Sequence, residues 1–186
     1  SALTQGIVFS SPGSAITTNI TNNSILNCSI AGAFTGIANT GTVSTLNILA
    51  NTISGTIRTG ASGNVIGISN SAAVVTAINI KNNRLGNPNI SGNAGRFITY
   101  QAASTGTLFG ITNTNGASTA TLTIDRNEIS GIVDDVTSAT VHTYIRNTSA
   151  IATQMISHNT FTNLNINSTG AITFIVGDEN LGASGS

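Results

Sequence analysis

Ile20-Thr21-Asn22-Asn23-Ser24-Ile25 carries the pattern that decides the fold of this chain: an apolar residue, two variable residues, an asparagine, one variable residue and a second apolar residue. The same pattern returns at residues 48–53, 80–85, 124–129 and 156–161. Self-similarity at a period of about 30 residues indicates a repeat protein, because each unit can bury its apolar face only against its neighbours.

A second pattern, a branched apolar residue followed by x-Asn-Thr/Ser, alternates with the first. Its asparagines are Asn39, Asn70, Asn113 and Asn147. A weaker copy at 173–179 closes the series and puts Val176 in the isoleucine position, and residues 6–11 resemble the second half of an earlier, incomplete unit. Short strands separated by asparagine turns, with no helical spacing, predict an all-β parallel β-helix of about five coils with three short strands per coil.

The repeated asparagines have a physical role in such a coil. A sharp corner needs a residue that tolerates a left-handed backbone, and asparagine does so better than any residue except glycine. Stacked side-chain amides can also donate and accept hydrogen bonds along the axis. The sequence therefore predicts structural ladders formed by Asn23, Asn51, Asn83, Asn127 and Asn159, and by Asn39, Asn70, Asn113 and Asn147.

Together the two patterns resemble the right-handed, pectin-lyase-like β-helix superfamily over nearly the whole chain. The resemblance implies right-handed coils, which the general handedness of parallel crossovers also favours. It implies little about activity, since the superfamily includes pectate lyases, polygalacturonases, phage tailspikes, adhesins and surface repeats. We expect residues 1–186 to form one domain, a segment of a longer repeat protein or a fibre subunit, with a flexible tail at 179–186.

Composition excludes several classes of function. Charged residues make up 6% of the chain, six basic against six acidic, so no positive field exists to attract nucleic acid. No apolar run is long enough to span a membrane. Solubility must come from neutral polar groups, among them 24 asparagines. Cys28 is the single cysteine, so no internal disulfide can form.

The third unit is longer than the others, which predicts a loop outgrowth at residues 92–107. Insertions in solenoids form loops on one face, often the binding face. Glycan binding there would use Phe97 or Tyr100 to stack on a sugar and Arg96 to contact acidic groups. A surface loop without a ligand is the alternative.

Two rows of side chains before the first motif are predicted to point outward on successive coils. They contain Thr17, Thr45, Thr121 and Thr153 in one row, and Asn19, Asn47, Asn79 and Thr123 in the other. The rows resemble the flat threonine arrays of ice-binding β-solenoids, although Ala77 and Met155 interrupt them.

The positions of the ionisable residues in the sequence indicate structural roles for them and not catalytic ones. Lys81 with Asp125, and Arg84 with Glu128, are predicted as cross-strand ion pairs on adjacent coils. The acidic pair Asp134-Asp135 is expected in a loop, with neighbouring side chains on opposite faces. His142 is expected in an apolar column as a satisfied, partly buried imidazole, and His158 at an exposed turn. No spacing typical of a metal site or a nucleophile motif occurs, so we expect no cofactor, no metal and no enzyme activity.

These features predict a non-catalytic stalk, adhesin or fibre segment located outside the cell or on its surface. Its expected partners are neighbouring coils of the same protein or a second copy joined head to tail. The alternative is a ligand-binding rod, for ice or for a glycan, and a polysaccharide lyase or hydrolase is less favoured.

Overall fold

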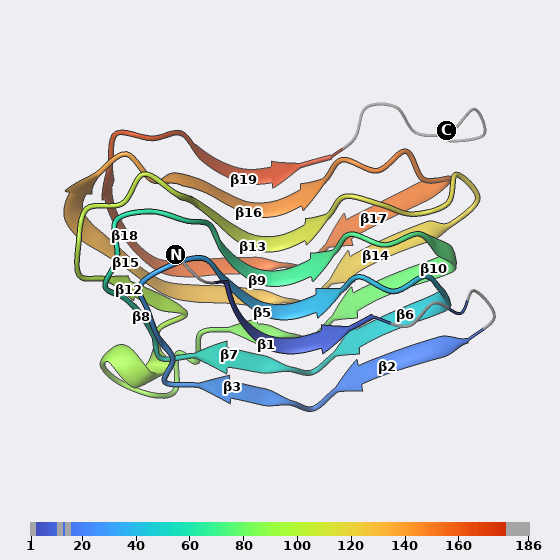
Figure 1. Ribbon diagram of the computed structural model, residues 1–186, viewed down its shortest axis with the longest axis horizontal. Helices are drawn as coiled ribbons and strands as arrows, with labels where there is room; N and C mark the ends of the chain where they lie inside the picture. Colours follow the sequence, from blue (N-terminus) through green and yellow to red (C-terminus); the bar gives the residue numbers. More distant parts are fainter. Residues whose placement is uncertain (1–2, 11–12, 14–15, 178–186) are drawn as a thin grey trace.

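A computed structural model describes residues 3–10, 13 and 16–177, and these residues form an all-β parallel solenoid of about five turns (Figure 1). This confirms the predicted fold class. The expected flexible tail at 179–186 lies outside the described residues.

Three parallel sheets run along the solenoid axis. Sheet A has six strands: β1 (Thr4–Phe9), β5 (Phe34–Asn39), β9 (Val65–Asn70), β13 (Thr107–Asn113), β16 (Val141–Asn147) and β19 (Ile172–Val176). Sheet B has five: β2 (Thr17–Thr21), β6 (Val43–Leu49), β10 (Val74–Lys81), β14 (Thr121–Asp125) and β17 (Thr153–Ser157). Figure 1 shows the strands of sheet A stacked in order from β1 to β19.

Sheet C bends within each coil, so that most coils contribute two short strands to it. They are β3 (Ser24–Leu26) with β4 (Ser29–Ile30), β7 (Thr52–Ser54) with β8 (Thr56–Arg58), and β11 (Arg84–Leu85) with β12 (Ile98–Tyr100). The longer strands β15 (Glu128–Ser138) and β18 (Thr160–Ser168) follow the same path. A short 3-10 helix, η1 (Asn93–Gly95), lies between β11 and β12.

The stacking register agrees with the first motif. Its opening isoleucines pair from coil to coil as Ile20, Ile48, Ile80, Ile124 and Ile156. The closing copy of the second motif is shifted by one residue from the prediction, because Ile145 pairs with Ile175 and Arg146 with Val176. This register places Ile175 in the column of Ile111 and Ile145.

The predicted asparagine ladders are present. In the first ladder each amide nitrogen donates to the next side-chain oxygen, at 3.0 Å for Asn23 to Asn51 and 2.9 Å for Asn51 to Asn83. The bonds from Asn83 to Asn127 and from Asn127 to Asn159 measure 2.9 and 3.0 Å. The second ladder joins Asn39, Asn70, Asn113 and Asn147, with bonds of 2.7 to 2.8 Å.

In the first ladder the left-handed corner residue is the one before each asparagine, which corrects the prediction. Positive φ angles of 51° to 57° occur at Asn22, Ala50, Asn82, Arg126 and His158. The ladder asparagines are instead positioned for hydrogen bonding. Asn51, for example, also donates to the main-chain oxygen of Ile20, at 2.8 Å. The turn and the ladder are therefore carried by adjacent residues.

Ala50 is strained by this arrangement, because its φ of 55° suits asparagine or glycine better than alanine. We expect Ala50→Asn to raise the free energy of unfolding by about 0.5–1 kcal/mol. Chemical denaturation measures the change. Ala150→Asn is the matched control, since Ala150 is also exposed but has no positive φ. Equal effects in the two variants would contradict the explanation.

Sheets A and C approach closely inside the solenoid. A glycine occupies the same inward position on three successive strands of sheet A: Gly36, Gly67 and Gly110. A Cβ added at these glycines would lie 2.5–2.7 Å from the Cδ1 atoms of Ile53, Leu85 and Ile129 of sheet C, respectively. In the last two coils Tyr144 and Phe174 take this position. Their rings form a cluster with Phe161, with centroids 5.2–5.7 Å apart. The core thus changes from aliphatic to aromatic towards the C-terminal coil.

The outgrowth of the third coil begins earlier than predicted. Twelve residues separate Leu85 from Ile98, whereas two separate their pairing partners Ile53 and Thr56. The insertion therefore lies at 86–97 and not at 92–107, although its length of about ten residues agrees with the prediction. The difference arises because residues 98–100 are the strand β12 and belong to sheet C.

Candidate functional site

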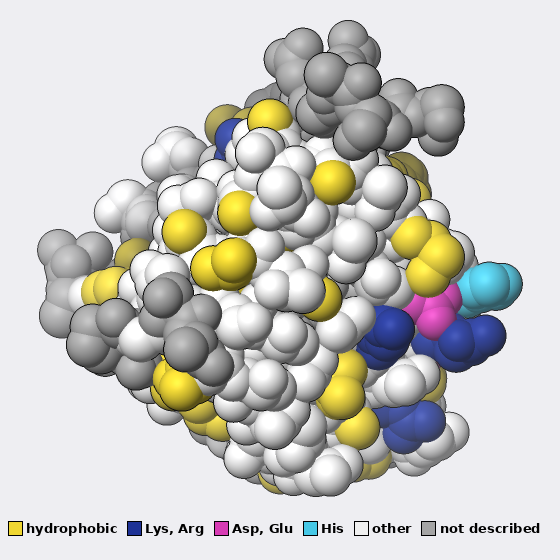
Figure 2. Space-filling model, turned by 90° about the vertical axis from the view of Figure 1, so that its right-hand side faces the viewer, with side chains coloured by type: hydrophobic (Ala, Val, Ile, Leu, Met, Phe, Trp, Pro, Cys, Tyr) yellow, Lys and Arg dark blue, Asp and Glu magenta, His cyan; other side chains and the backbone are white. Residues whose placement is uncertain are grey.

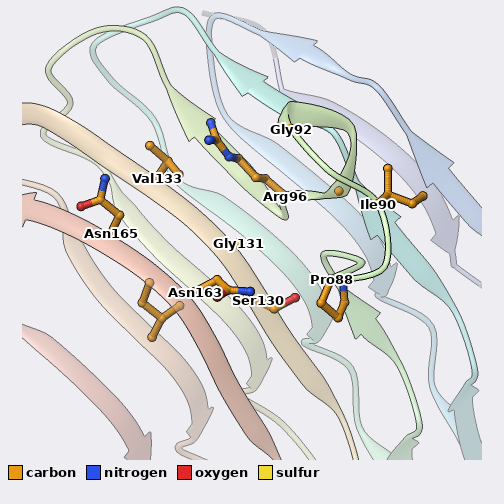
Figure 3. A pocket seen from close by; sticks show the side chains of 11 residues that line it. Pro88, Ile90, Gly92, Arg96, Ser130, Gly131, Val133, Asn163 and Asn165 are labelled. Atoms are coloured by element: carbon orange, nitrogen blue, oxygen red, sulfur yellow. The ribbon is translucent and has the colours of Figure 1, made fainter.

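A groove of about 410 Å³ lies between the outgrowth and the outer side of sheet C on the next two coils (Figure 3). The outgrowth contributes Pro88, Ile90, Gly92, Gly95 and Arg96. Strands β15 and β18 contribute Ser130, Gly131, Val133, Asn163, Leu164 and Asn165. This volume falls in the range of about 300–1,000 Å³ that is usual for small-molecule sites.

Main-chain contacts fix the wall of this groove. The amide of Asn87 donates to Gly95 O at 2.6 Å and closes the base of the outgrowth. The amide of Phe97 donates to Ser130 O at 3.1 Å. Gly131 has a φ of 67°, and an added Cβ there would lie 2.8 Å from the Cα of Arg96. The outgrowth is therefore held directly against β15.

Polar side chains line the groove. Ser130 is 1% exposed, so its Oγ, which has no hydrogen-bond partner among the described residues, is not open to a ligand. The Arg96 guanidinium donates to Asn93 Oδ1 at 2.7 Å from Nη1. Asn163 and Asn165 are exposed on the opposite side. Amide and guanidinium groups beside apolar Ile90 and Val133 suit an oxygen-rich ligand.

Of the residues predicted for glycan binding, the structure brings only Arg96 to the groove. Phe97 is 0% exposed and Tyr100 is 2% exposed, so neither ring can stack on a sugar from the surface. The prediction was wrong for these two because both belong to the return into sheet C. The sequence analysis did not predict Ser130, Asn163 and Asn165 as groove residues. Whether they line a groove depends on how far the outgrowth extends across the next two coils.

The two predicted outward rows do lie on the outer face of sheet B. Thr17, Thr45, Ala77, Thr121 and Thr153 pair in one row, and Asn19, Asn47, Asn79, Thr123 and Met155 in the other. Hydrogen bonds of 2.8 and 2.9 Å link Asn47 to Asn19 and Asn79 to Asn47. Ice binding by these rows stays a prediction, with Ala77 and Met155 as interruptions.

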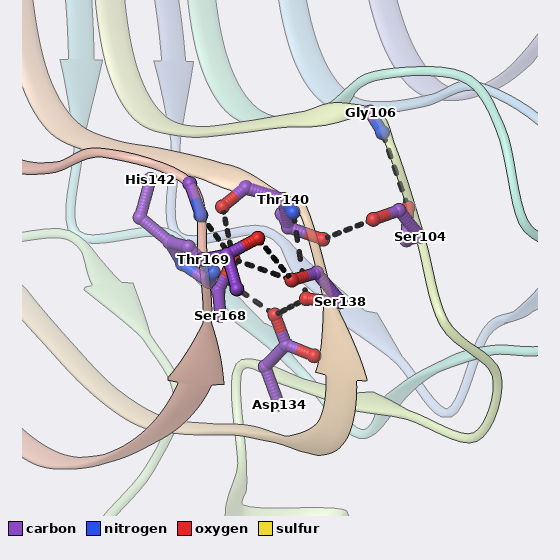
Figure 4. Close-up of polar contacts among 9 residues, drawn as sticks. Ser104, Gly106, Asp134, Ser138, Thr140, His142, Ser168 and Thr169 are labelled. Atoms are coloured by element: carbon purple, nitrogen blue, oxygen red, sulfur yellow. Dashed lines mark hydrogen bonds and ion pairs between the residues drawn. The ribbon is translucent and has the colours of Figure 1, made fainter.

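A buried polar cluster lies inside the last coils (Figure 4). Asp134 is in strand β15, not in the predicted loop, and points inward while Asp135 is exposed. Its Oδ2 accepts a hydrogen bond from Ser138 Oγ at 2.8 Å and lies 3.1 Å from Nε2 of His142. His142 pairs with Leu108 in the predicted column but is fully buried, and its Nδ1 lacks a partner among the described residues.

Other ionisable groups extend this cluster along the lumen. Arg58 is fully buried and donates to the main-chain oxygens of Gly32, Gly60 and Ser62. Burial lowers the pKa of Arg58. Burial, followed by the charge of Asp134, raises the pKa of both Tyr100 and Tyr144. Both phenols therefore stay neutral, and none of these buried groups contacts solvent as a catalytic group would.

Several surface charges lie together at one corner. Figure 2 shows a face of mostly uncharged side chains, and most of the charged side chains visible on it lie at its right-hand edge. Asp125 accepts hydrogen bonds from Ser157 Oγ at 2.8 Å and Arg126 Nη1 at 2.5 Å, and lies 2.9 Å from His158 Nδ1. The hydrogen bond with His158, followed by that with Ser157, lowers the pKa of Asp125.

Both predicted cross-strand registers are confirmed, Lys81 with Asp125 and Arg84 with Glu128. Only the second forms the expected ion pair, with 3.6 Å between Arg84 Nε and Glu128 Oε2. The Asp125 carboxylate is bonded to Arg126, Ser157 and His158 instead. The prediction used only the residues at matching strand positions, whereas the contacts come from the adjoining corner.

Within the described part of the chain, no three His, Cys, Asp or Glu side chains are placed to hold a metal ion. The same part contains no helix of the length and apolarity needed to cross a membrane. When the chain is compared with protein-family models, curated proteins and solved structures, nothing matches.

Proposed function

We propose that this chain is a non-catalytic structural segment of an extracellular or cell-surface protein, a stalk or adhesin rod of the pectin-lyase-like type. The first asparagine ladder carries the proposal, because it links five consecutive coils through amides that are buried in the three inner coils and partly buried at the two ends. Such a column, together with three continuous sheets, resists bending and shear between coils. Rigidity of this kind suits a spacer that holds another domain at a distance.

The inaccessibility of the ionisable groups supports a non-catalytic role. His142 and Asp134 are fully buried, so a substrate cannot reach them without the coils opening. A general acid or base must come within hydrogen-bonding distance of the reacting atom. The exposed His158 is paired with Asp125 at the surface corner.

Distance measurements between two spin labels test whether the solenoid is rigid. Thr17 and Thr153 are exposed in the same row on the first and last coils, four strand spacings apart, which is about 19 Å. Thr17→Cys and Thr153→Cys in a Cys28→Ser background should give one narrow distance distribution. A broad or bimodal distribution would contradict a rigid spacer. Cleavage of any uronic-acid polymer by the purified chain would contradict the non-catalytic assignment.

The ends of the solenoid are included in the proposal. Apolar side chains exposed in the first and last coils include Leu3, Val8, Ile16, Leu26, Ile172, Phe174 and Ile175. We propose that neighbouring coils of the same kind cover them. Light scattering of the purified chain should therefore show association that rises with concentration, and Phe174→Ser should reduce it.

The groove favours a second candidate function, binding of a saccharide that carries a carboxylate. Arg96 would pair with the carboxylate, and the exposed Asn163 and Asn165 would contact sugar hydroxyls. This set of donors lies on one rigid wall and one sheet. The glycan-binding hypothesis therefore moves from the aromatic residues to the groove.

A glycan array followed by titration tests this candidate. Arg96→Ala should weaken binding at least about tenfold, as expected for a hydrogen bond to a charged group. Lys81→Ala is the control, because it removes a cation outside the groove. Binding that is equal in wild type and Arg96→Ala, or absent for every acidic glycan, would reject the groove as a saccharide site.

A further inference from the structure

Asn115 is the asparagine of this chain that is followed by glycine, and it lies at an exposed corner between sheets A and B. The amide nitrogen of Gly116 donates to Asn115 Oδ1 at 2.8 Å. A carbonyl bond measures about 1.23 Å, so this nitrogen lies at most about 4 Å from the Asn115 Cγ. The groups that form a succinimide ring are therefore already adjacent in the folded protein.

The remaining contacts also suit ring closure. Glycine has no side chain to obstruct the approach of its nitrogen. The leaving amide of Asn115 is held by one long hydrogen bond, 3.3 Å from Nδ2 to Ser71 O. By contrast, the ladder amide of Asn70 donates to Asn113 Oδ1 and to Asn115 O, both at 2.7 Å. The buried ladder asparagines are thus protected, whereas Asn115 is not.

We propose that Asn115 is a site of spontaneous deamidation built into this corner. The Gly116 nitrogen attacks Cγ of Asn115 and forms the C–N bond of a succinimide, while the Cγ–Nδ2 bond breaks. The proton of the Gly116 amide goes, through solvent, to the leaving amide, which departs as ammonia. Water then adds to one of the two imide carbonyls and opens the ring. The products are aspartate or isoaspartate, and no oxidant or reductant is needed.

The modification acts on the second asparagine ladder. Isoaspartate adds one methylene to the main chain between Asn115 and Gly116. This segment is anchored on both sides, by Asn70 Nδ2 to Asn115 O at 2.7 Å and by Ala117 N to Val74 O at 2.8 Å. Gly116 has little freedom to shift, because a Cβ there would lie 3.0 Å from Ile151 Cγ2. In isoaspartate the oxygen that accepts from Asn70 belongs to a free carboxylate outside the main chain, so this bond no longer holds the lengthened main chain and the ladder loses support at Asn70.

Peptide mapping by mass spectrometry after incubation of the folded protein at mildly alkaline pH tests the proposal. Asn115 should convert before any other asparagine, at a rate within about tenfold of that in the denatured chain, because the Gly116 nitrogen stays within about 4 Å of the Asn115 Cγ in the fold. Asn115→Gln should abolish this conversion. The isoaspartyl fraction should melt below Asn115→Asp, which adds the charge without the methylene. Earlier conversion elsewhere, stronger suppression by folding, or equal melting of the two forms would overturn the proposal.

Discussion

Asn83→Ala is expected to lower the free energy of unfolding by about 4 kcal/mol, because it opens the first ladder at its centre. Asn83 is fully buried, and its Oδ1 accepts from both the main-chain and side-chain nitrogens of Asn51, at 3.0 and 2.9 Å. Its Nδ2 donates to Ile48 O at 2.8 Å and to Asn127 Oδ1 at 2.9 Å. Alanine leaves several of these groups buried and unpaired.

Asn19→Ala is the matched control for this prediction. Asn19 also belongs to a row of hydrogen-bonded asparagines, but it is exposed and accepts a single bond of 2.8 Å from Asn47. Water can replace that bond, so the expected loss is below about 1 kcal/mol. Denaturant unfolding of both variants gives the two values. Equal losses would show that burial of the ladder amides does not determine their contribution.

Gly67→Ala is expected to lower the free energy of unfolding by about 3 kcal/mol through overpacking. The added methyl would lie 2.6 Å from the main-chain oxygen of Gly110 and 2.7 Å from Cδ1 of Leu85. Leucine can rotate, but the oxygen belongs to the next coil and is held in sheet A. The strand must therefore move, and the inter-coil hydrogen bonds of β9 and β13 weaken.

Gly92→Ala separates this packing effect from backbone strain. Gly92 has a φ of 70°, but no atom lies within 4 Å of its ideal Cβ. Only the conformational cost remains; because ψ is −160°, the conformation is nearly restricted to glycine, and we expect the cost to be about 2 kcal/mol. Thermal unfolding of the two variants provides the comparison. A loss for Gly67→Ala no larger than that for Gly92→Ala would mean that sheets A and C are not in close contact.

The sequence pattern alone correctly predicted residue pairs between adjacent coils wherever the repeat determines which residues are stacked. Ile20 and Ile48 share a position in the motif, and a parallel coil places equal positions one above another. The same reasoning correctly predicted that Arg84 pairs with Glu128 and that Asn51 bonds to Asn83. It failed by one residue for Val176, where the asparagine that anchors the register is missing.

The candidate groove could be predicted only in part from the sequence pattern. The length of the third coil predicts an outgrowth, but not which residues leave the sheet or where the chain returns. Arg96 stays at the surface, whereas Tyr100, four residues later, is inside the lumen near Asp134. Ser130 carries no local signal, because its Oγ becomes buried only when the outgrowth covers it.

The sequence by itself determined the solenoid, its register and its amide ladders, because these depend on the identity of residues at a constant spacing. The tertiary structure decided which residue makes each corner, where the outgrowth leans and which ionisable groups meet in the lumen. His142 and Asp134 come from different sheets, and their contact depends on how sheets A and C face one another across the core. No periodic pattern along the chain encodes a distance across the coil, so that part required the packed structure.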